Sequence, residues 1–471
     1  MSDQPSSKMI RYMLTDRLAR LTGTAMFFGL LGTAVRVGSN ILLLPVALAH
    51  LSPAEMSAWW IFLSLGAISN LADFGFAPAI TRVYSFLWAG ADDFDVEGLR
   101  PPREHDKPNL PRISQLHGTV AHLYGLLAAL VALALAGGGT FFLWRTGYLI
   151  ESHYGWIAWA VFIAVTTLNL KTSYWSMAAQ GINRVREVQM SNLLGGLVYL
   201  FVGAFLLMCG LKLLALAAAV GTRAIVSRWV CMHAFRQAAY SDDLQPTGYD
   251  RSMLTRLWPN AKKLGIMSIG SYCITQGLIL VGSQFLPVET VASLGLTQQI
   301  GIFATSIASL WLQVKWPQIT ILRTQGRLQE MSALFAQRLF LAIASFALIA
   351  AVIIAAGNMF LEWKGTQTRL LPFLPLTYYL GYLAFQMTYG TFGVLTMTEN
   401  VIPFHRIAIF TGIAAVTLSV LMTSRWHLWG LLLAPLICEA AYSAWFTIRR
   451  GFAGQPLTVG QFVRAAVPAR P

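Results

Sequence analysis

Charged residues are scarce in this chain, and their scarcity argues against a soluble protein. Aspartate, glutamate, lysine and arginine make up 11% of its 471 residues, whereas 56% of the residues are hydrophobic. A soluble chain is normally about a quarter charged. Apolar runs of about 20 residues recur along the whole length, and a run of that size can span a bilayer as a helix. The composition therefore predicts a membrane protein with many spanning helices.

Acidic residues are outnumbered by basic ones, since 20 Asp and Glu against 34 Lys and Arg give a formal charge of +14. In a chain this apolar, the excess of basic residues need not indicate binding to nucleic acid, and we expect no nucleic-acid partner.

The four cysteines stand singly within apolar runs, so neither a zinc site nor a disulfide framework is predicted. No cleavable signal peptide is visible, because no short apolar core follows the polar first 20 residues.

Motifs of soluble catalysis are missing as well. The sequence has no GxxxxGKS/T loop, so we expect no nucleotide hydrolysis by that route. Asp73-Phe74-Gly75 matches the magnesium motif of kinases, but it lies in an apolar run with no other kinase element. The eight histidines form no HExxH or other metal-spaced cluster. We therefore expect no metal, no cofactor and no enzymatic activity, and a transporter instead.

The apolar runs predict about twelve spans. Their approximate limits are 22–48, 56–89, 115–144, 156–180, 187–209, 212–235, 263–286, 291–318, 334–357, 370–396, 404–424 and 428–448. The second run is long for one span, and Gly75 and Pro78 predict a break or kink in it. About 22 of the 34 Lys and Arg fall in segments on one side and five on the other. This asymmetry predicts cytoplasmic N- and C-termini.

Two sequence echoes indicate that the chain is duplicated. Residues 51–55 (LSPAE) end the first predicted span, and residues 285–289 (FLPVE) end the seventh. Residues 180–183 (QGIN) follow the fourth span, and residues 397–400 (MTEN) follow the tenth. Parallel repeats around a central substrate site are a known transporter plan. We therefore predict an all-α polytopic membrane protein, with about 12 transmembrane helices in two six-helix lobes related by a parallel pseudo-two-fold repeat.

The predicted domains follow from these spans. They are a cytoplasmic amphipathic lead-in (1–21), an N-lobe of spans one to six (22–235), a cytoplasmic inter-lobe linker (236–262), a C-lobe of spans seven to twelve (263–448) and a cytoplasmic tail (449–471).

Ionisable residues inside the predicted spans are the first candidates for function. A charge at the centre of a bilayer costs roughly 2.5–3.5 kcal/mol on insertion scales, so it is rarely kept without a use. Arg36, Lys171 and Arg223 lie deep in their spans and are predicted to face a wet internal cavity, with internal ion pairing as the alternative. Other in-span cations near cytoplasmic ends are expected to extend to lipid headgroups: Arg228, Lys315 and Arg338.

Polar stripes at helical spacing support a cavity. Asn40 shares a face with Arg36, Asp73 with Asn70, and Tyr174 with Lys171. In the second half the stripes are uncharged, and they run Ser268, Ser271, Thr275; Ser306, Ser309, Gln313; and Tyr378, Tyr382, Gln386, Tyr389. Ordinary interhelical hydrogen bonding explains the serines and threonines equally well. The rings and amides of the last stripe suit sugar hydroxyls.

The sign of the in-span charges predicts the ligand. Several cations and only two acids, Asp73 and Glu439, lie within the spans. Such a cavity favours an anion, and arginine binds phosphate oxygens through its fork of donors. Alternatively, Asp73 is placed to form an ion pair with Arg36 or Arg82. Energy coupling stays open, because Asp73 or Glu439 could carry a proton, a sodium ion could bind, or the membrane potential could drive an anion outward.

These residues resemble a known family. The LSPAE turn after a proline-containing first span, DFGFAPAITR at the end of the second (residues 73–82) and QGIN after the fourth are similar to bacterial polysaccharide or O-antigen flippases. That family belongs to the superfamily that also contains multidrug and toxin extrusion antiporters and the lipid II flippase. The similar layout covers nearly the whole chain.

The resemblance implies two six-helix lobes around a central cavity in the bacterial inner membrane, working by alternating access. It implies transfer of a polyprenyl-diphosphate-linked oligosaccharide from the cytoplasmic to the outer leaflet. The cations Arg36, Lys171, Arg223 and Arg82 would meet the diphosphate. The polar and coupling candidates are Asn40, Asp73, Tyr174, Tyr382, Gln386 and Glu439. The expected partners are that substrate, membrane lipid, and a polysaccharide polymerase with its chain-length machinery.

Two other functions stay open at this point. A drug or cation antiporter on the same scaffold would depend on Asp73 or Glu439, and it would tolerate neutralisation of Arg36. A membrane glycosyltransferase or polysaccharide polymerase would need a sizeable outer loop or domain for its chemistry, whereas the predicted outer loops are all short.

Overall fold

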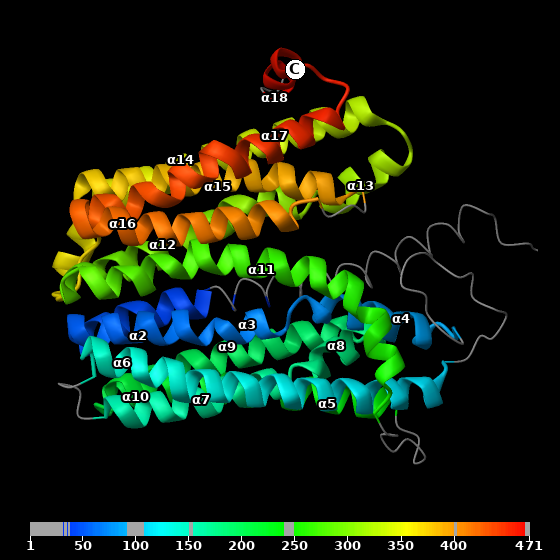
Figure 1. Ribbon diagram of the computed structural model, residues 1–471, viewed down its shortest axis with the longest axis horizontal. Helices are drawn as coiled ribbons and strands as arrows, with labels where there is room; N and C mark the ends of the chain where they lie inside the picture. The colour runs from blue at the N-terminus through cyan, green and yellow to red at the C-terminus, as the bar shows by residue number, and fades with distance from the viewer. Residues whose placement is uncertain are drawn as a thin grey trace, which may run out of the picture. The chain divides into compact units, whose positions relative to one another are not determined.

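The computed structural model describes residues 32, 35, 38–91, 108–149, 154–239, 249–399 and 403–466. Helices joined by short turns make up this part of the chain, and no strand occurs in it (Figure 1). The predicted all-α polytopic fold is thereby confirmed. The amphipathic lead-in predicted over residues 1–21 and the cavity candidate Arg36 lie outside the described residues.

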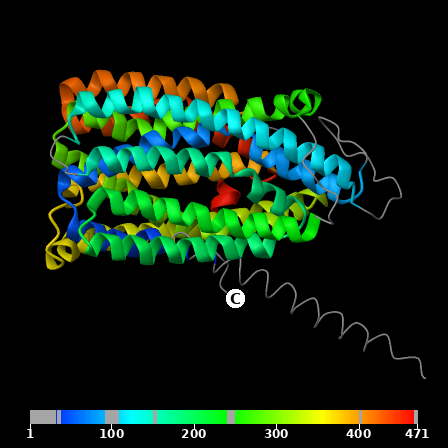
Figure 2. The same cartoon turned by 90° about the horizontal axis from the view of Figure 1, so that it is seen from below.

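The chain divides into two compact units built from interleaved segments. Unit 1 comprises Met1–Val46, Phe76–Leu133 and Ile157–Pro259, and unit 2 comprises Ala47–Gly75, Ala134–Trp156 and Asn260–Pro471. The predicted lobes, 22–235 and 263–448, stay a prediction. Within each unit the long helices run side by side, and they keep this course when the view is turned (Figures 1 and 2).

Unit 1 holds six labelled helices. They are α4 (Phe76–Trp88), α5 (Leu110–Ala134), α7 (Gly155–Lys171), α8 (Tyr174–Gly181), α9 (Val185–Met208) and α10 (Lys212–Ala239). An unlabelled helix, Gly38–His50, precedes them and continues into unit 2.

Unit 2 holds the remaining helices. They are α2 (Pro53–Gly66), α3 (Ile68–Ala72), η1 (Leu135–Gly139), α6 (Thr140–Thr146), α11 (Arg251–Phe285, which begins in unit 1), α12 (Val288–Gln313), α13 (Trp316–Thr324), α14 (Leu328–Trp363), α15 (Phe373–Met397), α16 (His405–Cys438), η2 (Glu439–Ser443), α17 (Ala444–Ala453) and α18 (Val459–Ala466). The elements η1 and η2 are π-helices.

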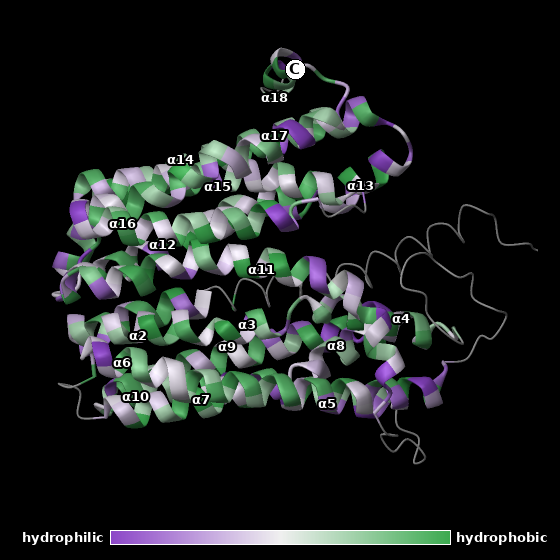
Figure 3. Ribbon diagram, in the orientation of Figure 1, coloured by the Kyte–Doolittle hydropathy of each residue, from purple (hydrophilic) through white to green (hydrophobic). Residues whose placement is uncertain are grey.

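The long helices are apolar enough to span a membrane. Seven stretches of the described chain meet that criterion, or up to eight with the bent α2–α4 pair. Each of the twelve predicted spans contains a described helix. The counts differ because one stretch, His405–Ala453, covers two predicted spans, and because the helices of three others, Gly38–His50, α7 and α15, do not meet the criterion. A kink at His427, where φ is 47°, separates the two parts of His405–Ala453. Hydrophobic residues occupy most of each long helix, and many of the hydrophilic residues lie near helix ends (Figure 3).

The turn before α2 is fixed by its sequence. Ser52 and Glu55 form a capping box, since the Glu55 N–H donates to Ser52 Oγ at 3.3 Å and the Ser52 N–H donates to Glu55 Oε2 at 3.0 Å. Pro53 occupies the first helical turn, where its missing N–H costs nothing. Ser57 then donates to the carbonyl of Val288 at 2.7 Å, which ties α2 to the start of α12.

Aromatic clusters form the core of each unit. In unit 1, His117 is 4% exposed, hydrogen-bonded through Nδ1 to Tyr84 Oη at 3.0 Å and stacked on Phe235 at 5.0 Å. In unit 2, Phe335 and Phe392 pack at 5.2 Å. Their rings also pack against Phe462 of α18. These clusters hold α4, α5 and α10 together in one unit, and α14, α15 and α18 in the other.

Three of the five places where the chain passes from one unit to the other lie beside irregular backbone. Gly75 ends one segment at the bend between α3 and α4, Ala134 begins another directly before η1, and Pro259 ends a third inside α11. In such places the regular helical hydrogen-bond ladder is interrupted.

The predicted break in the second span is confirmed at residues 73–75. The helix pair bends by 43° there, and both Phe74 (φ 47°) and Gly75 (φ 75°) adopt left-handed backbone. Glycine adopts this conformation without steric cost. The site is also tight, because a Cβ added at Gly75 would lie 2.4 Å from the Cβ of Leu264.

We predict that Gly75→Ala destabilises the protein. Left-handed backbone costs an L-residue about 1–2 kcal/mol and overpacking about 1–3 kcal/mol, so we expect a loss of roughly 2–5 kcal/mol in the free energy of unfolding. The measurement is the melting temperature in detergent micelles. The matched control is Gly125→Ala, where an added Cβ meets nothing within 4 Å and the melting temperature should not fall. Equal melting temperatures for the two variants would contradict this account.

Candidate functional site

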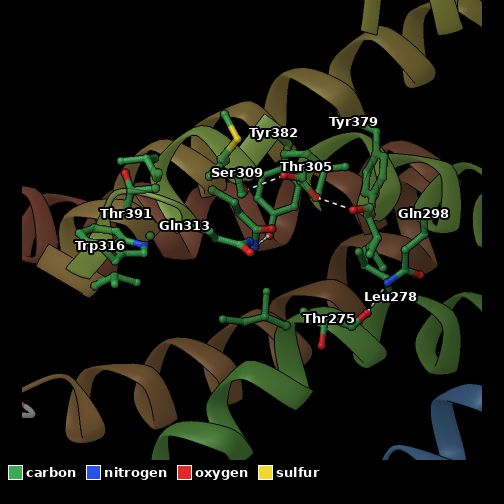
Figure 4. Close-up of a pocket in the computed structure, with 18 residues that line it drawn as sticks. Thr275, Leu278, Gln298, Thr305, Ser309, Gln313, Trp316, Tyr379, Tyr382 and Thr391 are labelled. Carbon is green, nitrogen blue, oxygen red and sulfur yellow. Dashed lines mark hydrogen bonds between the residues drawn. The ribbon is translucent and has the colours of Figure 1, made fainter. Parts of the chain in front are cut away.

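A cavity of about 500 Å³ lies within unit 2 (Figure 4). It is lined by residues of α11, α12, α13 and α15. Half of its lining is polar, and those residues are Thr275, Gln298, Thr305, Ser309, Gln313, Tyr379, Tyr382, Gln386 and Thr391. No charged residue belongs to the lining that the described chain provides. The cavity therefore offers hydroxyls, amides and aromatic rings to a ligand.

Helical spacing brings these side chains to one wall. Gln298, Thr305 and Ser309 recur at intervals of seven and four residues on α12, which places them on one face of the helix. Tyr379, Tyr382 and Gln386 recur at intervals of three and four residues and likewise share one face of α15. Of the ten stripe residues in the second half of the sequence, five line the cavity: Thr275, Ser309, Gln313, Tyr382 and Gln386. The other five do not belong to its lining: Ser268, Ser271, Ser306, Tyr378 and Tyr389.

Most small hydroxyls of the wall are already satisfied by their own helix. Ser309 Oγ donates to the Thr305 carbonyl at 2.6 Å, and Thr305 Oγ1 donates to the Gly301 carbonyl at 3.1 Å. Each hydroxyl keeps free acceptor capacity, because an oxygen that donates once can still accept. Gln298 Nε2 donates to the Thr275 carbonyl at 2.8 Å and so joins α12 to α11. The wall is therefore ordered before any ligand arrives.

Gln386 connects the cavity to a buried acid. Its Nε2 donates to Tyr382 Oη at 2.7 Å and to Glu439 Oε1 at 2.9 Å. Glu439 begins the π-helix η2 and is 1% exposed. The hydroxyls of Tyr382 and Tyr389 also form hydrogen bonds with this carboxyl. No cation of the described chain pairs with it. Three of the predicted polar and coupling residues are thus brought together: Tyr382 and Gln386 line the cavity, and Glu439 lies behind them.

The predicted cations of the first half are not gathered in this cavity. Lys171 is exposed at the end of α7, and Arg82 is exposed on α4 with its guanidinium 6.0 Å from the Phe86 ring centre. Arg223 is half-buried on α10, 5.7 Å from the ring centre of Tyr199. All of them belong to unit 1, whereas the cavity belongs to unit 2. Their common role in one binding site stays a prediction.

The remaining candidates occupy structural positions. Asn40 lies half-buried in the helix Gly38–His50. Asp73 lies half-buried at the bend between α3 and α4 and has an interaction partner. Tyr174 packs edge-on against His117, with ring centres 5.1 Å apart. Their predicted part in the cavity or in coupling stays a prediction.

The sequence analysis missed the setting of Arg228. We expected this side chain to extend to a lipid headgroup, but it is bonded within unit 1. Its guanidinium donates to Asn169 Oδ1 at 3.0 Å, to the Ser173 carbonyl at 3.4 Å and to Ser176 Oγ. Asn169, Ser173 and Ser176 recur at intervals of four and three residues, a polar stripe that could have revealed the partner surface.

Comparison with known proteins identifies the fold. No family model and no curated protein matches the chain. The lipid II flippase MurJ in an inward closed conformation matches with a TM-score of 0.59 at 13% identity, over 93% of this chain and 90% of that chain. An inward-facing multidrug resistance MATE family transporter of the MOP superfamily matches with a TM-score of 0.58 at 11% identity, over 90% and 98%.

A third match is the MATE transporter VcmN of Vibrio cholerae, in mutant form, with a TM-score of 0.51 at 15% identity, over 94% of this chain and 98% of that chain. At such identities the likeness concerns the fold alone. These neighbours are transporters and flippases rather than enzymes. The chain therefore has the fold of the MOP-superfamily transporters.

Proposed function

We propose that this chain is a flippase. It moves a polyprenyl-diphosphate-linked oligosaccharide from the cytoplasmic to the outer leaflet by alternating access, for surface polysaccharide assembly. The observation that carries the proposal is the uncharged lining of the cavity in unit 2, where polar side chains and rings face a space of about 500 Å³. That volume lies within the range of small-molecule sites.

Sugars fit such a lining for a chemical reason. A neutral glycan presents hydroxyl groups that both donate and accept hydrogen bonds. Gln298 and Gln313 can do both in return, whereas the two donors of Gln386 are already bonded to Tyr382 and Glu439 and only its carbonyl oxygen is offered to a ligand. It also presents apolar C–H faces, and Trp316 on the same wall offers a large ring surface to them. A cavity for organic cations would be expected to place a carboxylate in the lining, and the described lining has none.

The diphosphate is assigned to the cations of unit 1. Lys171 and Arg82 are exposed and Arg223 is half-buried, so their charges are accessible to an anion. Arginine donors match phosphate oxygens, and a lysine adds a point charge. Arg36 is proposed as a fourth member of this set on its sequence position alone.

The fold supports transport rather than a particular cargo. One neighbour is named for lipid II, a lipid-linked substrate, and others are named for multidrug resistance. The proposed cytoplasmic position of both termini rests on the distribution of Lys and Arg in the sequence. Placement in the bacterial inner membrane rests on the resemblance to bacterial flippases. The transporter neighbours give the glycosyltransferase alternative no support.

A multidrug or cation antiporter is the second candidate, and one observation favours it. Glu439 is a buried carboxyl that contacts the cavity through Gln386 and has no cationic partner among the described residues. A buried acid of this kind suits proton or cation exchange. In a flippase the same group would serve as the coupling residue, so the two functions differ in what the cations of unit 1 do.

We predict that the residues lining the cavity of unit 2 are required for export of the lipid-linked sugar. Deleting the gene should make lipid-linked repeat units accumulate on the cytoplasmic leaflet, and the wild-type chain should reverse this. Gln386→Ala and Trp316→Ala should each reduce surface polysaccharide about tenfold or more, because a buried hydrogen bond or a ring contact is lost. Matched controls are Thr377→Ala and Trp363→Ala, both at exposed positions. Full export by the wall variants would contradict the proposed site.

We further predict that charge changes separate the two candidates. A flippase needs its cations, so Lys171→Gln and Arg223→Gln should impair export of the lipid-linked sugar and leave resistance to cationic drugs unchanged. An antiporter would instead lose drug efflux in Glu439→Gln and tolerate both cation variants. Surface polysaccharide and drug susceptibility are measured in the same deletion strain. Loss of drug resistance without loss of polysaccharide would overturn the flippase proposal.

A further inference from the structure

A second pocket lies in unit 1, apart from every residue assigned above. It has a volume of about 250 Å³. The residues that line it come from the end of α7, the start of α8 and the middle of α10, and they are Leu168, Thr172, Trp175, Ala224, Ile225, Arg228, Trp229 and Met232. Arg228 is the one cation of this lining, as far as the described chain forms it.

Among the residues that the structure describes, only neutral groups bond to the guanidinium of Arg228. Asn169 Oδ1, the Ser173 carbonyl and Ser176 Oγ accept its hydrogen bonds. Its Nε is buried and has no hydrogen-bond partner among the described residues. These contacts orient the side chain but leave its positive charge without an acidic counterpart.

An uncompensated charge in an apolar surrounding needs an explanation. Burying a cation is costly unless an anion or a set of strong dipoles replaces its hydration. If Arg228 served only to tie α10 to α7 and α8, a neutral amide could make similar hydrogen bonds without that cost. In membrane spans such residues are usually kept for binding. The missing counterion is therefore expected to come from a ligand.

The apolar residues that line the pocket indicate that its ligand also carries a hydrocarbon chain. Trp229 is 61% exposed, Ile225 is 56% exposed and Leu168 is 45% exposed. Exposed apolar side chains on a membrane helix contact hydrocarbon, and a tryptophan lies readily beside both a polar group and an apolar chain. The pocket thus combines one fixed cation with an open apolar border.

We propose that this pocket binds the phosphate of a lipid, with the guanidinium of Arg228 on the phosphate oxygens and the hydrocarbon chain along Ile225 and Trp229. Arginine donors match phosphate geometry. A membrane phospholipid and a polyprenyl phosphate share this chemistry, and the experiment separates them. The inference does not depend on the proposed function, because a lipid phosphate can bind here whatever cargo the chain moves.

Native mass spectrometry of the purified full chain in detergent micelles tests this. The probes are dioleoyl phosphatidylglycerol, a polyprenyl phosphate, dioleoylglycerol and inorganic phosphate. Binding should require both parts, so we expect one or both lipid phosphates to bind at least tenfold more tightly than dioleoylglycerol or inorganic phosphate. Preference for either lipid phosphate supports the site and names its source. Equal binding of dioleoylglycerol would overturn the proposal.

Variants assign the binding to Arg228. Arg228→Gln should weaken lipid phosphate binding about tenfold or more, and Arg228→Lys should weaken it less because it keeps the charge. The matched control is Arg449→Gln, which removes an exposed arginine that lies 5.2 Å from the Trp445 ring centre in unit 2, and it should bind as the wild type does. Unchanged binding by Arg228→Gln would overturn the proposal.

A second variant covers the case in which Arg228→Gln does not fold. Ala224→Phe fills the pocket from α10 and leaves Arg228 and its hydrogen bonds in place. We expect the same tenfold loss of lipid phosphate binding, with an elution profile that matches the wild type. A folded Ala224→Phe protein that binds lipid phosphate as tightly as the wild type would contradict the pocket assignment.

Discussion

Two buried ionisable groups held by neutral neighbours are the constraint on which the rest of this structure depends. In unit 1, Arg228 is bonded to an amide, a carbonyl and a hydroxyl. In unit 2, Glu439 is bonded by the amide of Gln386 and approached by tyrosine hydroxyls. Neither group has an opposite charge beside it in the described chain. Each unit therefore contains a buried ionisable group, and burying it costs free energy because neutral contacts orient the group but supply no opposite charge.

The two groups differ in what surrounds them. Glu439 lies behind a wall of amides, hydroxyls and rings, so a ligand in that cavity meets neutral chemistry first and the acid only through Gln386. Arg228 lies directly in a pocket with an open apolar border. Neutral hydrogen bonding with an acid behind it suits a sugar and a coupling step, and a cation beside hydrocarbon suits a lipid phosphate.

Much of the fold could be predicted from the sequence, because the period of apolar and polar residues fixes helices. The break at Gly75 followed from residue type and spacing, and the structure confirms it. Of the ten residues in the polar stripes of α11, α12 and α15, five line the cavity and five do not. Arg228 could not be predicted in the same way. Its position near a helix end suggested a headgroup contact, but its partners come from residues 169–176, more than 50 positions earlier in the chain. Tertiary contacts at that separation leave no local pattern around the arginine itself.

The central claim is that the neutral cavity of unit 2 receives the glycan of a lipid-linked substrate. The most direct measurement is photo-crosslinking with a polyprenyl-diphosphate-linked oligosaccharide that carries its photoreactive group on a sugar, followed by peptide mapping. The account predicts adducts on the cavity faces of α12 and α15, around Gln298, Ser309 and Gln386, and competition by the unlabelled lipid-linked sugar. Adducts confined to segments outside this cavity would contradict it.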